Sequence, residues 1–299
     1  MRNVMLLGIL GFYFLVMGAN HLAQGEVAEL CPDLETLTRS IHIDLDEASW
    51  PDNLTPAMPN HHVDIVPDPD GEDMPVMRIT FPPDSFYGAS MHIPLVDDQG
   101  DEPDTAMLSY QIYFDEAWET TLSGKLPGFS GTYFRGGWGG RPSDGYNGWS
   151  ARGMFSPTTE DGAVPIGAYL YHTETQLDRP DYVYGEGVSY HNQHNTPPLE
   201  RGRWYTVQQY VRLNSVETLD GEAHGEAEEA TEGRMDGVLR AWIDGEQVYN
   251  REDLRFRHTD RLRIQSAWLD FYHGGKDPAP RELIVYIRNI KVITEASAE

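Results

Sequence analysis

The sequence predicts an all-β protein built as a sandwich of antiparallel sheets. Glycine, proline and tyrosine are plentiful, with 29, 20 and 16 residues, and they favour turns and strands over helices. Apolar residues at helical spacing are scarce, while short strand-like segments recur between turn-rich stretches. A chain of 299 residues can bury a large core. We therefore expect one domain over residues 26–299, with its core at about 72–293.

The first 25 residues have the pattern of a signal peptide. Arg2 precedes an apolar run over 4–17, and Ala23 and Gly25 have the spacing of a signal-peptidase site. The alternative is a membrane anchor, but the run is shorter than the roughly 20 residues that cross a bilayer. The pattern predicts a protein that is secreted or periplasmic and is not held in a membrane after cleavage.

The strands are expected in the rest of the chain. Residues 26–71 are rich in Asp, Pro and Asn and predict an edge segment with long loops and one strand at 40–45. Beyond them, segments rich in β-branched and aromatic residues are separated by turn residues, as is typical of a sandwich. These segments are 77–81, 107–114, 149–155, 166–172, 205–214, 238–243, 262–272 and 283–292.

Two segments are expected to be loops. Residues 217–233 are rich in Glu, Gly, Ala and Asp and predict an exposed, mobile acidic loop. A structural calcium ion is compatible with that composition, although no EF-hand spacing supports it. Residues 136–140, Gly-Gly-Trp-Gly-Gly, predict a flexible loop that carries the ring of Trp138, either over a sugar chain or as a plain connection. Cys31 is the only cysteine and neither CxxC nor HExxH occurs, so no required cofactor or catalytic metal is expected.

The net charge argues against nucleic acid as a partner. The formal charge is −26, whereas phosphate binding relies on patches of lysine and arginine. A polyanionic substrate would also be repelled unless its site formed a local positive island. Residues 123–155 form such an island, with four basic residues and one acidic residue. They are Lys125, Arg135, Arg141, Arg152 and Asp144.

Alternation along strands groups the candidate catalytic residues. Ser150 and Arg152 share one face of their strand, and Tyr169 and Tyr171 share a face of theirs, roughly 7 Å apart. β-Elimination in a uronic acid needs a base for the C5 proton, an acid for the departing glycosidic oxygen and a cation that neutralises the carboxylate. The tyrosines are candidates for the proton transfers, and Lys125 and Arg152 for the carboxylate. Two tyrosines at this spacing also suit an ordinary amphipathic strand.

A tyrosine base sets a condition on pH. The pKa of free tyrosine is near 10, so the phenolate forms only where neighbouring cations lower the pKa or the medium is alkaline. We therefore expect an alkaline optimum.

Several motifs follow one another in a fixed order through residues 108–292. They are Gly-Lys-Leu-Pro-Gly at 124–128, interpreted as a turn, Ser-x-Arg-x-Met at 150–154, Tyr-x-Tyr at 169–171, and the segments 203–214, 236–245 and 271–275. This series resembles polysaccharide lyase family 14, the alginate lyases, and its last two segments are also similar to the family 20 glucuronan lyases.

The resemblance implies a β-jelly roll whose concave sheet forms the substrate cleft. It implies a lyase acting on alginate (polymannuronate) or glucuronan, with Lys125, Ser150, Arg152, Tyr169 and Tyr171 at the matching catalytic positions. Two departures leave the choice of substrate open. Phe-Ser-Gly-Thr at 129–132 replaces an aromatic residue and paired glycines, and the acidic segment from residue 217 is an insertion.

Further residues are candidates for the cleft or for a solvated sheet face. Alternation in 205–214 points three polar residues outward, and Gln111 and Tyr113 share a side of their strand. His191, three residues before His194, suits either a loop or the site. The expected substrate contacts are Ser150, Arg135, Trp138, Gln111, Tyr113, Gln208, Tyr210, Arg212 and His191.

Two other functions fit an acidic β-sandwich. A glycoside hydrolase needs two carboxylates roughly 5 to 10 Å apart, and Asp115, Glu116 and Glu119 form the compact acidic cluster that invites this comparison. A noncatalytic carbohydrate-binding protein needs aromatic and basic residues along its surface, but it does not need the combination of Lys125 with paired tyrosines. In each case we expect a monomer that binds acidic polysaccharide.

Overall fold

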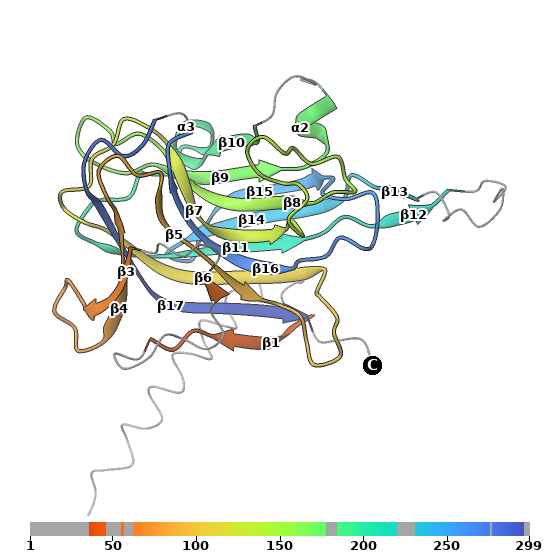
Figure 1. Ribbon diagram of the computed structural model, residues 1–299, viewed down its shortest axis with the longest axis horizontal. Coiled ribbons are helices and arrows are strands. Elements are labelled where there is room, and N and C mark those ends of the chain that lie inside the picture. The colour runs from red at the N-terminus through yellow and green to blue at the C-terminus, as the bar shows by residue number, and fades with distance from the viewer. Residues whose placement is uncertain are drawn as a thin grey trace, which may run out of the picture.

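The computed structural model describes residues 36–45, 55–56, 62–177, 184–219, 231–275 and 277–295. Two antiparallel sheets pack face to face, and a short two-stranded ribbon extends from one end (Figure 1). The first sheet contains β1 (Leu37–His42), β3 (Val63–Pro67), β4 (Pro75–Phe81), β6 (Thr105–Phe114), β11 (Trp204–Arg212), β14 (Gly237–Ile243), β15 (Glu246–Leu254) and β17 (Leu283–Glu295). The second contains β2 (Thr55–Pro56), β5 (Tyr87–Pro94), β7 (Gly124–Gly131), β8 (Trp149–Phe155), β9 (Ile166–Tyr171), β10 (Glu186–Ser189) and β16 (Ser266–His273). The remaining elements are α2 (Glu174–Leu177), α3 (Tyr190–His194), β12 (Val216–Thr218) and β13 (Thr231–Gly233).

In both sheets, strands that are distant in the sequence lie side by side. The eight-stranded sheet runs β15-β14-β11-β6-β17-β4-β3, with β1 paired to β17, and the seven-stranded sheet runs β10-β9-β8-β7-β16-β5-β2. This is the all-β jelly-roll sandwich of antiparallel sheets that the sequence predicts. The expected signal peptide at 1–25 and Cys31 lie outside the described residues. No helix in the described part of the chain is both long and apolar enough to cross a membrane.

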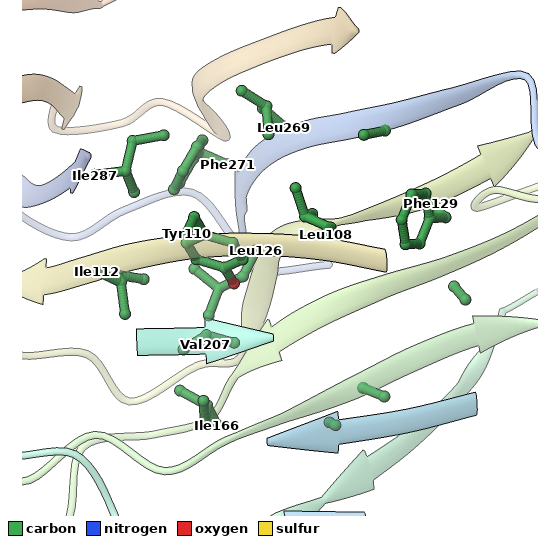
Figure 2. Packing of buried hydrophobic residues seen from close by; sticks show 14 of the residues in the cluster. Leu108, Tyr110, Ile112, Leu126, Phe129, Ile166, Val207, Leu269, Phe271 and Ile287 are labelled. Atoms are coloured by element: carbon green, nitrogen blue, oxygen red, sulfur yellow. The ribbon is translucent and has the colours of Figure 1, made fainter. Parts of the chain in front are cut away.

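The core fills the space between the two sheets. Every second side chain of β6 points into it, and side chains from β7, β9, β11, β16 and β17 meet them there (Figure 2). Each apolar side chain buried in this way contributes about 1.5–3 kcal/mol relative to solvent exposure. The labelled members are Leu108, Tyr110, Ile112, Leu126, Phe129, Ile166, Val207, Leu269, Phe271 and Ile287. Because strand side chains alternate, the residues between these positions belong to the outer faces of the sheets.

Residues 124–128 are not a turn, as the sequence suggested, but the first part of β7. All eight residues of β7 are buried, and the strand pairs with β8 on one side and β16 on the other. The pairing with β8 shifts register between Leu126 and Gly128, so Pro127 sits at an irregularity where a missing N–H is tolerated. The sequence pattern does not predict this strand, because proline and glycine, of which it has one and three, are uncommon in central strands.

Other boundaries also differ from the prediction. The strand expected at 40–45 begins earlier, as β1, and the one expected at 262–272 begins only at Ser266. Strands β3, β5, β10 and β15 were not predicted. The ends of the acidic segment are paired, because β12 and β13 form an antiparallel ribbon. Residues 220–230 lie outside the described part of the chain.

Candidate active site

The register of the seven-stranded sheet brings the predicted catalytic residues together. Arg152 on β8 lies directly opposite Tyr169 on β9, and Ser150 lies opposite Tyr171. Lys125 on β7 lies opposite Met154 of β8. Opposed residues of an antiparallel pair share a face. Trp149, Ala151, Phe155, Ala168 and Leu170 belong to the core, so the predicted catalytic residues lie on the outer face.

Arg152 forms a buried ion pair that the sequence analysis did not anticipate. Its Nη1 lies 2.6 Å from Oδ2 of Asp270 on β16, and the two side chains are 6% and 3% exposed. The guanidinium carbon also lies 4.5 Å from the ring centre of Trp268. Trp268 is held in turn by a 2.9 Å hydrogen bond from its Nε1 to Ser90 Oγ. The arginine is therefore fixed by a carboxylate and an aromatic face together.

Lys125 is buried beside Tyr169. Its Nζ lies 3.6 Å from the centre of the Tyr169 ring, and the residue is 8% exposed. Burial lowers the pKa of the Lys125 amine to about 7, Arg152 adds to that effect, and Asp270 opposes it. A substantial fraction of this amine is therefore neutral near pH 7.

The two tyrosines form a pair on β9. Their ring centres are 5.7 Å apart, and a hydrogen bond links the two side chains. Burial, with a smaller contribution from Tyr169, raises the pKa of Tyr171 above its usual value, and Arg152 offsets this only in part. Of the two conditions for a tyrosine base, the lowering of the pKa by nearby cations is not met at Tyr171, because desolvation outweighs them; an alkaline medium is the condition that remains.

The glycine-rich loop borders these residues. Ser150 Oγ donates a 2.6 Å hydrogen bond to the carbonyl of Gly137, and a Cβ at Gly139 would lie 3.8 Å from the Tyr171 hydroxyl. Trp138 is half-buried, and the Arg141 guanidinium carbon lies 5.5 Å from its ring centre. Arg135 is exposed on the same loop. The loop therefore lies beside Ser150 and Tyr171, and its role over a sugar chain stays a prediction.

Two tyrosines on the other side of Lys125 were missed. Tyr272 of β16 pairs in register with both Lys125 and Tyr87, and the rings of Tyr87 and Tyr272 are 4.9 Å apart. A signal for Tyr272 exists in the sequence, because Trp268, Asp270 and Tyr272 alternate along the strand and so share a face. We call Lys125, Arg152, Tyr169, Tyr171 and Asp270 the site cluster.

Several predicted contacts lie on the opposite side of the molecule. They belong to β6 and β11 of the eight-stranded sheet and alternate with core residues, so they lie on its outer face. Tyr210 is fully buried there, in a small apolar cluster with Met107, Val238 and Trp242. The alternation was correct, but a sandwich has two outer faces and alternation does not distinguish them. The residues misplaced in this way are Gln111, Tyr113, Gln208, Tyr210 and Arg212.

The histidine and carboxylate candidates are also engaged elsewhere. His191 Nδ1 lies 2.9 Å from the carbonyl of Thr196, within the turn that ends α3. Asp115 Oδ1 accepts a hydrogen bond from the Ala117 amide at the end of β6, and Glu119 pairs with Arg281 at 3.0 Å. Within the described residues, no three potential ligands are arranged to hold a metal ion.

A hollow of about 600 Å³ lies apart from the site cluster. Its lining mixes both charges and includes Arg39, Asp101, Glu102, Arg263 and Glu295, and no residue of the site cluster belongs to it. Arg39 is already engaged there, because it donates to the carbonyls of the adjoining β5–β6 connection. We therefore place the candidate active site at the site cluster, because of the chemistry of its side chains, and not at this hollow.

The protein is a polysaccharide lyase with a β-sandwich fold, and a buried lysine and arginine lie beside a tyrosine pair on one of its sheet faces. The model of the family Polysaccharide lyase 14 matches residues 69–290, and the chain belongs to this family. The resemblance inferred from the motifs is confirmed. No match was found among curated protein sequences.

Solved structures share the fold at low sequence identity. Alginate lyase Aly36B is 20% identical, with a TM-score of 0.61 over 87% of this chain and 98% of its own. Alginate lyase vAL-1 from Chlorella virus is 17% identical, with a TM-score of 0.60 over 85% and 98%. The endo-β-1,4-glucuronan lyase from the fungus Trichoderma reesei is 14% identical, with a TM-score of 0.53 over 86% and 96%.

Proposed function

We propose that this polysaccharide lyase cleaves a polyuronate by β-elimination at the site cluster. The observation that carries the proposal is a buried lysine and a buried arginine beside two hydrogen-bonded tyrosines on one sheet face. Such a site can hold a uronate carboxylate, remove the proton beside it and protonate the leaving oxygen. A hydrolase would instead need two free carboxylates, whereas Asp270 is tied to Arg152.

Arg152 is the group that we assign to the substrate carboxylate. Only its Nη1 bonds to Asp270, and its buried Nε finds no hydrogen-bond partner among the described residues. A guanidinium has five donors in a planar fork that matches a carboxylate. The remaining donors would stabilise the charge that develops on the carboxylate as the neighbouring C–H bond breaks.

Lys125 and Tyr171 are the groups that we assign to the two proton transfers. The neutral Lys125 amine takes the C5 proton, the C5 electron pair forms the C4–C5 double bond, and the C4–O bond breaks. The departing glycosidic oxygen takes the proton of Tyr171. The low pKa of Lys125 supports its role as the base, and the raised pKa of Tyr171 keeps its hydroxyl protonated as the acid.

This division of roles differs from the one expected from the sequence. There, tyrosines carried both proton transfers and Lys125 helped to neutralise the carboxylate. A tyrosine base is disfavoured by the burial of Tyr171, whereas the buried amine of Lys125 is neutral at a lower pH. Arg152 remains positively charged in either scheme.

The substrate is proposed to be alginate or glucuronan, because the solved structures that share this fold are lyases for these two polymers. The test is the mass of the oligosaccharide products from each polymer. Elimination yields fragments that carry an unsaturated uronate at the new end, and hydrolysis yields fragments heavier by one water. Saturated products would contradict the proposed reaction while leaving a carbohydrate site intact.

We also propose that the protein is exported through residues 1–25 and acts as a monomer without a required cofactor. The apolar run after Arg2 supports export. Sequencing the amino terminus of the exported protein checks the cleavage, and a retained leader would contradict it. Activity that survives a chelating agent is the outcome expected for a site made of lysine, arginine and tyrosine.

A further inference from the structure

We propose that Asp270 is a positioning residue of this site, which holds the guanidinium of Arg152 in place and balances the positive charges of Arg152 and Lys125. It acts through these two cations and not on the sugar. The inference deepens the proposed function and rests on it for the roles of the two cations.

The first argument is the path of the Arg152 side chain. Arg152 belongs to β8 and Asp270 to β16, and β7 lies between these two strands. Gly128 of β7 pairs in register with Arg152 on one side and with Trp268 on the other. The arginine therefore crosses β7 at a residue without a side chain and ends against Trp268 and Asp270. An arginine that spans two strands needs an anchor at its far end.

The second argument is burial. Asp270 is 2% exposed and Arg152 is 5% exposed, so their charges interact with little screening by solvent. Desolvating a carboxylate is costly, so a buried one needs a close cation to compensate for it, and removing either partner leaves an uncompensated buried charge. Here the carboxylate of Asp270 balances the positive charge of Arg152, and Arg152 is the residue that binds the substrate carboxylate in the proposed reaction.

The third argument concerns Lys125. The charged and titratable groups around Lys125 and Asp270 are Arg152 from β8, Tyr169 and Tyr171 from β9, Tyr272 from β16 and Tyr87 from β5. Lys125 pairs in register with Tyr272, which lies two residues after Asp270 on the same face of β16. Asp270 is therefore close to the Lys125 amine and raises its pKa, whereas Arg152 lowers it. Without Asp270, the unbalanced charge of Arg152 lowers the pKa of Lys125 further.

The test compares Asp270→Asn with the parent chain and with the control Asp98→Asn, which removes an equal charge from an exposed position. The measurement is the rate at which an amine-reactive anhydride acylates Lys125 as a function of pH, followed by peptide mass spectrometry. Only the neutral amine reacts. We expect Lys125 of Asp270→Asn to react about tenfold faster than Lys125 of the parent at a pH below the midpoint of the parent's rate–pH curve. The loss of one close negative charge lowers the pKa of the amine, so more of it is neutral. An unchanged midpoint in folded Asp270→Asn would overturn the charge-balancing role.

Asp270→Glu is a second variant, and it also tests the proposal if Asp270→Asn does not fold. It keeps the charge but moves the carboxylate by one methylene. The Lys125 midpoint should stay near that of the parent, while KM rises severalfold because the guanidinium is displaced. An unchanged KM would overturn the positioning role.

The two proposals fail in different ways. If the parent chain releases no unsaturated product but the Lys125 midpoint shifts in Asp270→Asn, the proposed reaction is wrong and the charge balance stands. If the parent is an active lyase and the midpoint does not shift, the assignment of Asp270 is wrong and the reaction stands.

Discussion

Lys125 Nζ lies 3.6 Å from the centre of the Tyr169 ring, with Arg152 directly opposite Tyr169 on the neighbouring strand. Burial and Arg152 favour the neutral amine, and Asp270 favours the protonated amine. The balance places the pKa of Lys125 at about 7, which is where a general base works best near neutral pH.

The first prediction is the pH dependence of activity. A base must be neutral, so kcat/KM should rise as pH increases through about 7, the pKa of the Lys125 amine, and then level off. The profile is measured in buffers of constant ionic strength. A rate that falls as pH rises through this value would mean that the protonated amine is the active form, as the carboxylate-neutralising role requires.

The second prediction is that Tyr171→Phe removes the proton donor. We expect kcat to fall by about a hundredfold to ten-thousandfold, the range typical of a lost general acid, with KM little changed. The matched control is Tyr190→Phe, which removes a hydroxyl from a tyrosine that is equally buried but lies on α3. Comparable kcat values for the two variants would remove Tyr171 from the mechanism.

The third prediction concerns the glycine-rich loop. Ser150→Ala removes the 2.6 Å hydrogen bond to Gly137 and should cost about 1 kcal/mol in the free energy of unfolding, with a rise in KM as the loop leaves the sheet. In Ser143→Ala, the control, the lost hydroxyl is buried and has no hydrogen-bond partner among the described residues. Equal effects of the two substitutions on KM would show that the Ser150 hydrogen bond does not hold the loop in place.

The fourth prediction concerns Gly128. A Cβ there would lie 2.3 Å from the Ala151 carbonyl oxygen and 2.5 Å from the Arg152 Cα, so Gly128→Ala must push β8 away from β7. We expect a loss of about 1–3 kcal/mol in the free energy of unfolding and a larger loss of activity, because Arg152 moves with its strand. Gly275→Ala is the control, since a Cβ there meets nothing within 4 Å. A fully active Gly128→Ala enzyme would contradict this account of how Arg152 is placed.

The fifth prediction concerns the edge where the two sheets meet. Glu186 of β10 accepts from His172 at 2.8 Å and from Arg251 of β15 at 2.9 Å. The hydrogen bond with His172 and then Arg251 lower the pKa of Glu186 to about 2. A lowered carboxylate pKa gives stability that is present above the unfolded value of about 4.5 and is lost as pH falls toward 2.

The corresponding variant is Glu186→Gln. It should unfold at lower urea than the parent at neutral pH, and the difference should shrink as the solution is acidified. The difference will be modest because Glu186 is 39% exposed and solvent screens the pair. A difference that does not depend on pH would show that Glu186 contributes by packing alone.

The sequence was sufficient for the parts of the site that are local in the chain. Tyr169 and Tyr171 share a face because strand side chains alternate, and Arg152 meets them because β8 and β9 are consecutive strands that pair. The position of Ser150 opposite Tyr171 follows from the same register. Such neighbours need only period-two alternation and an antiparallel connection, both of which a sequence displays.

The remaining parts depend on which strands become neighbours. Asp270 is 118 residues from Arg152 in the chain, and the charge balance of residues 123–155 does not include it. Gln208 and Arg212 alternate correctly on β11 but lie on the wrong outer face, because alternation does not reveal the sheet to which a strand belongs. The sequence predicts a turn where β7 begins, because a proline such as Pro127 stands in a central strand only where the pairing is irregular.

The most direct test of the central claim is the ultraviolet absorbance of unsaturated uronate when the purified protein is mixed with alginate, polymannuronate, polyguluronate or glucuronan, with Lys125→Ala and Tyr171→Phe run in parallel. The account predicts that absorbance rises with at least one polymer for the parent chain and stays flat for both folded variants. A rise that is equal in the parent and the variants would contradict the assigned site. No rise with any of the four polymers, from a folded protein that still binds them, would contradict the proposed reaction.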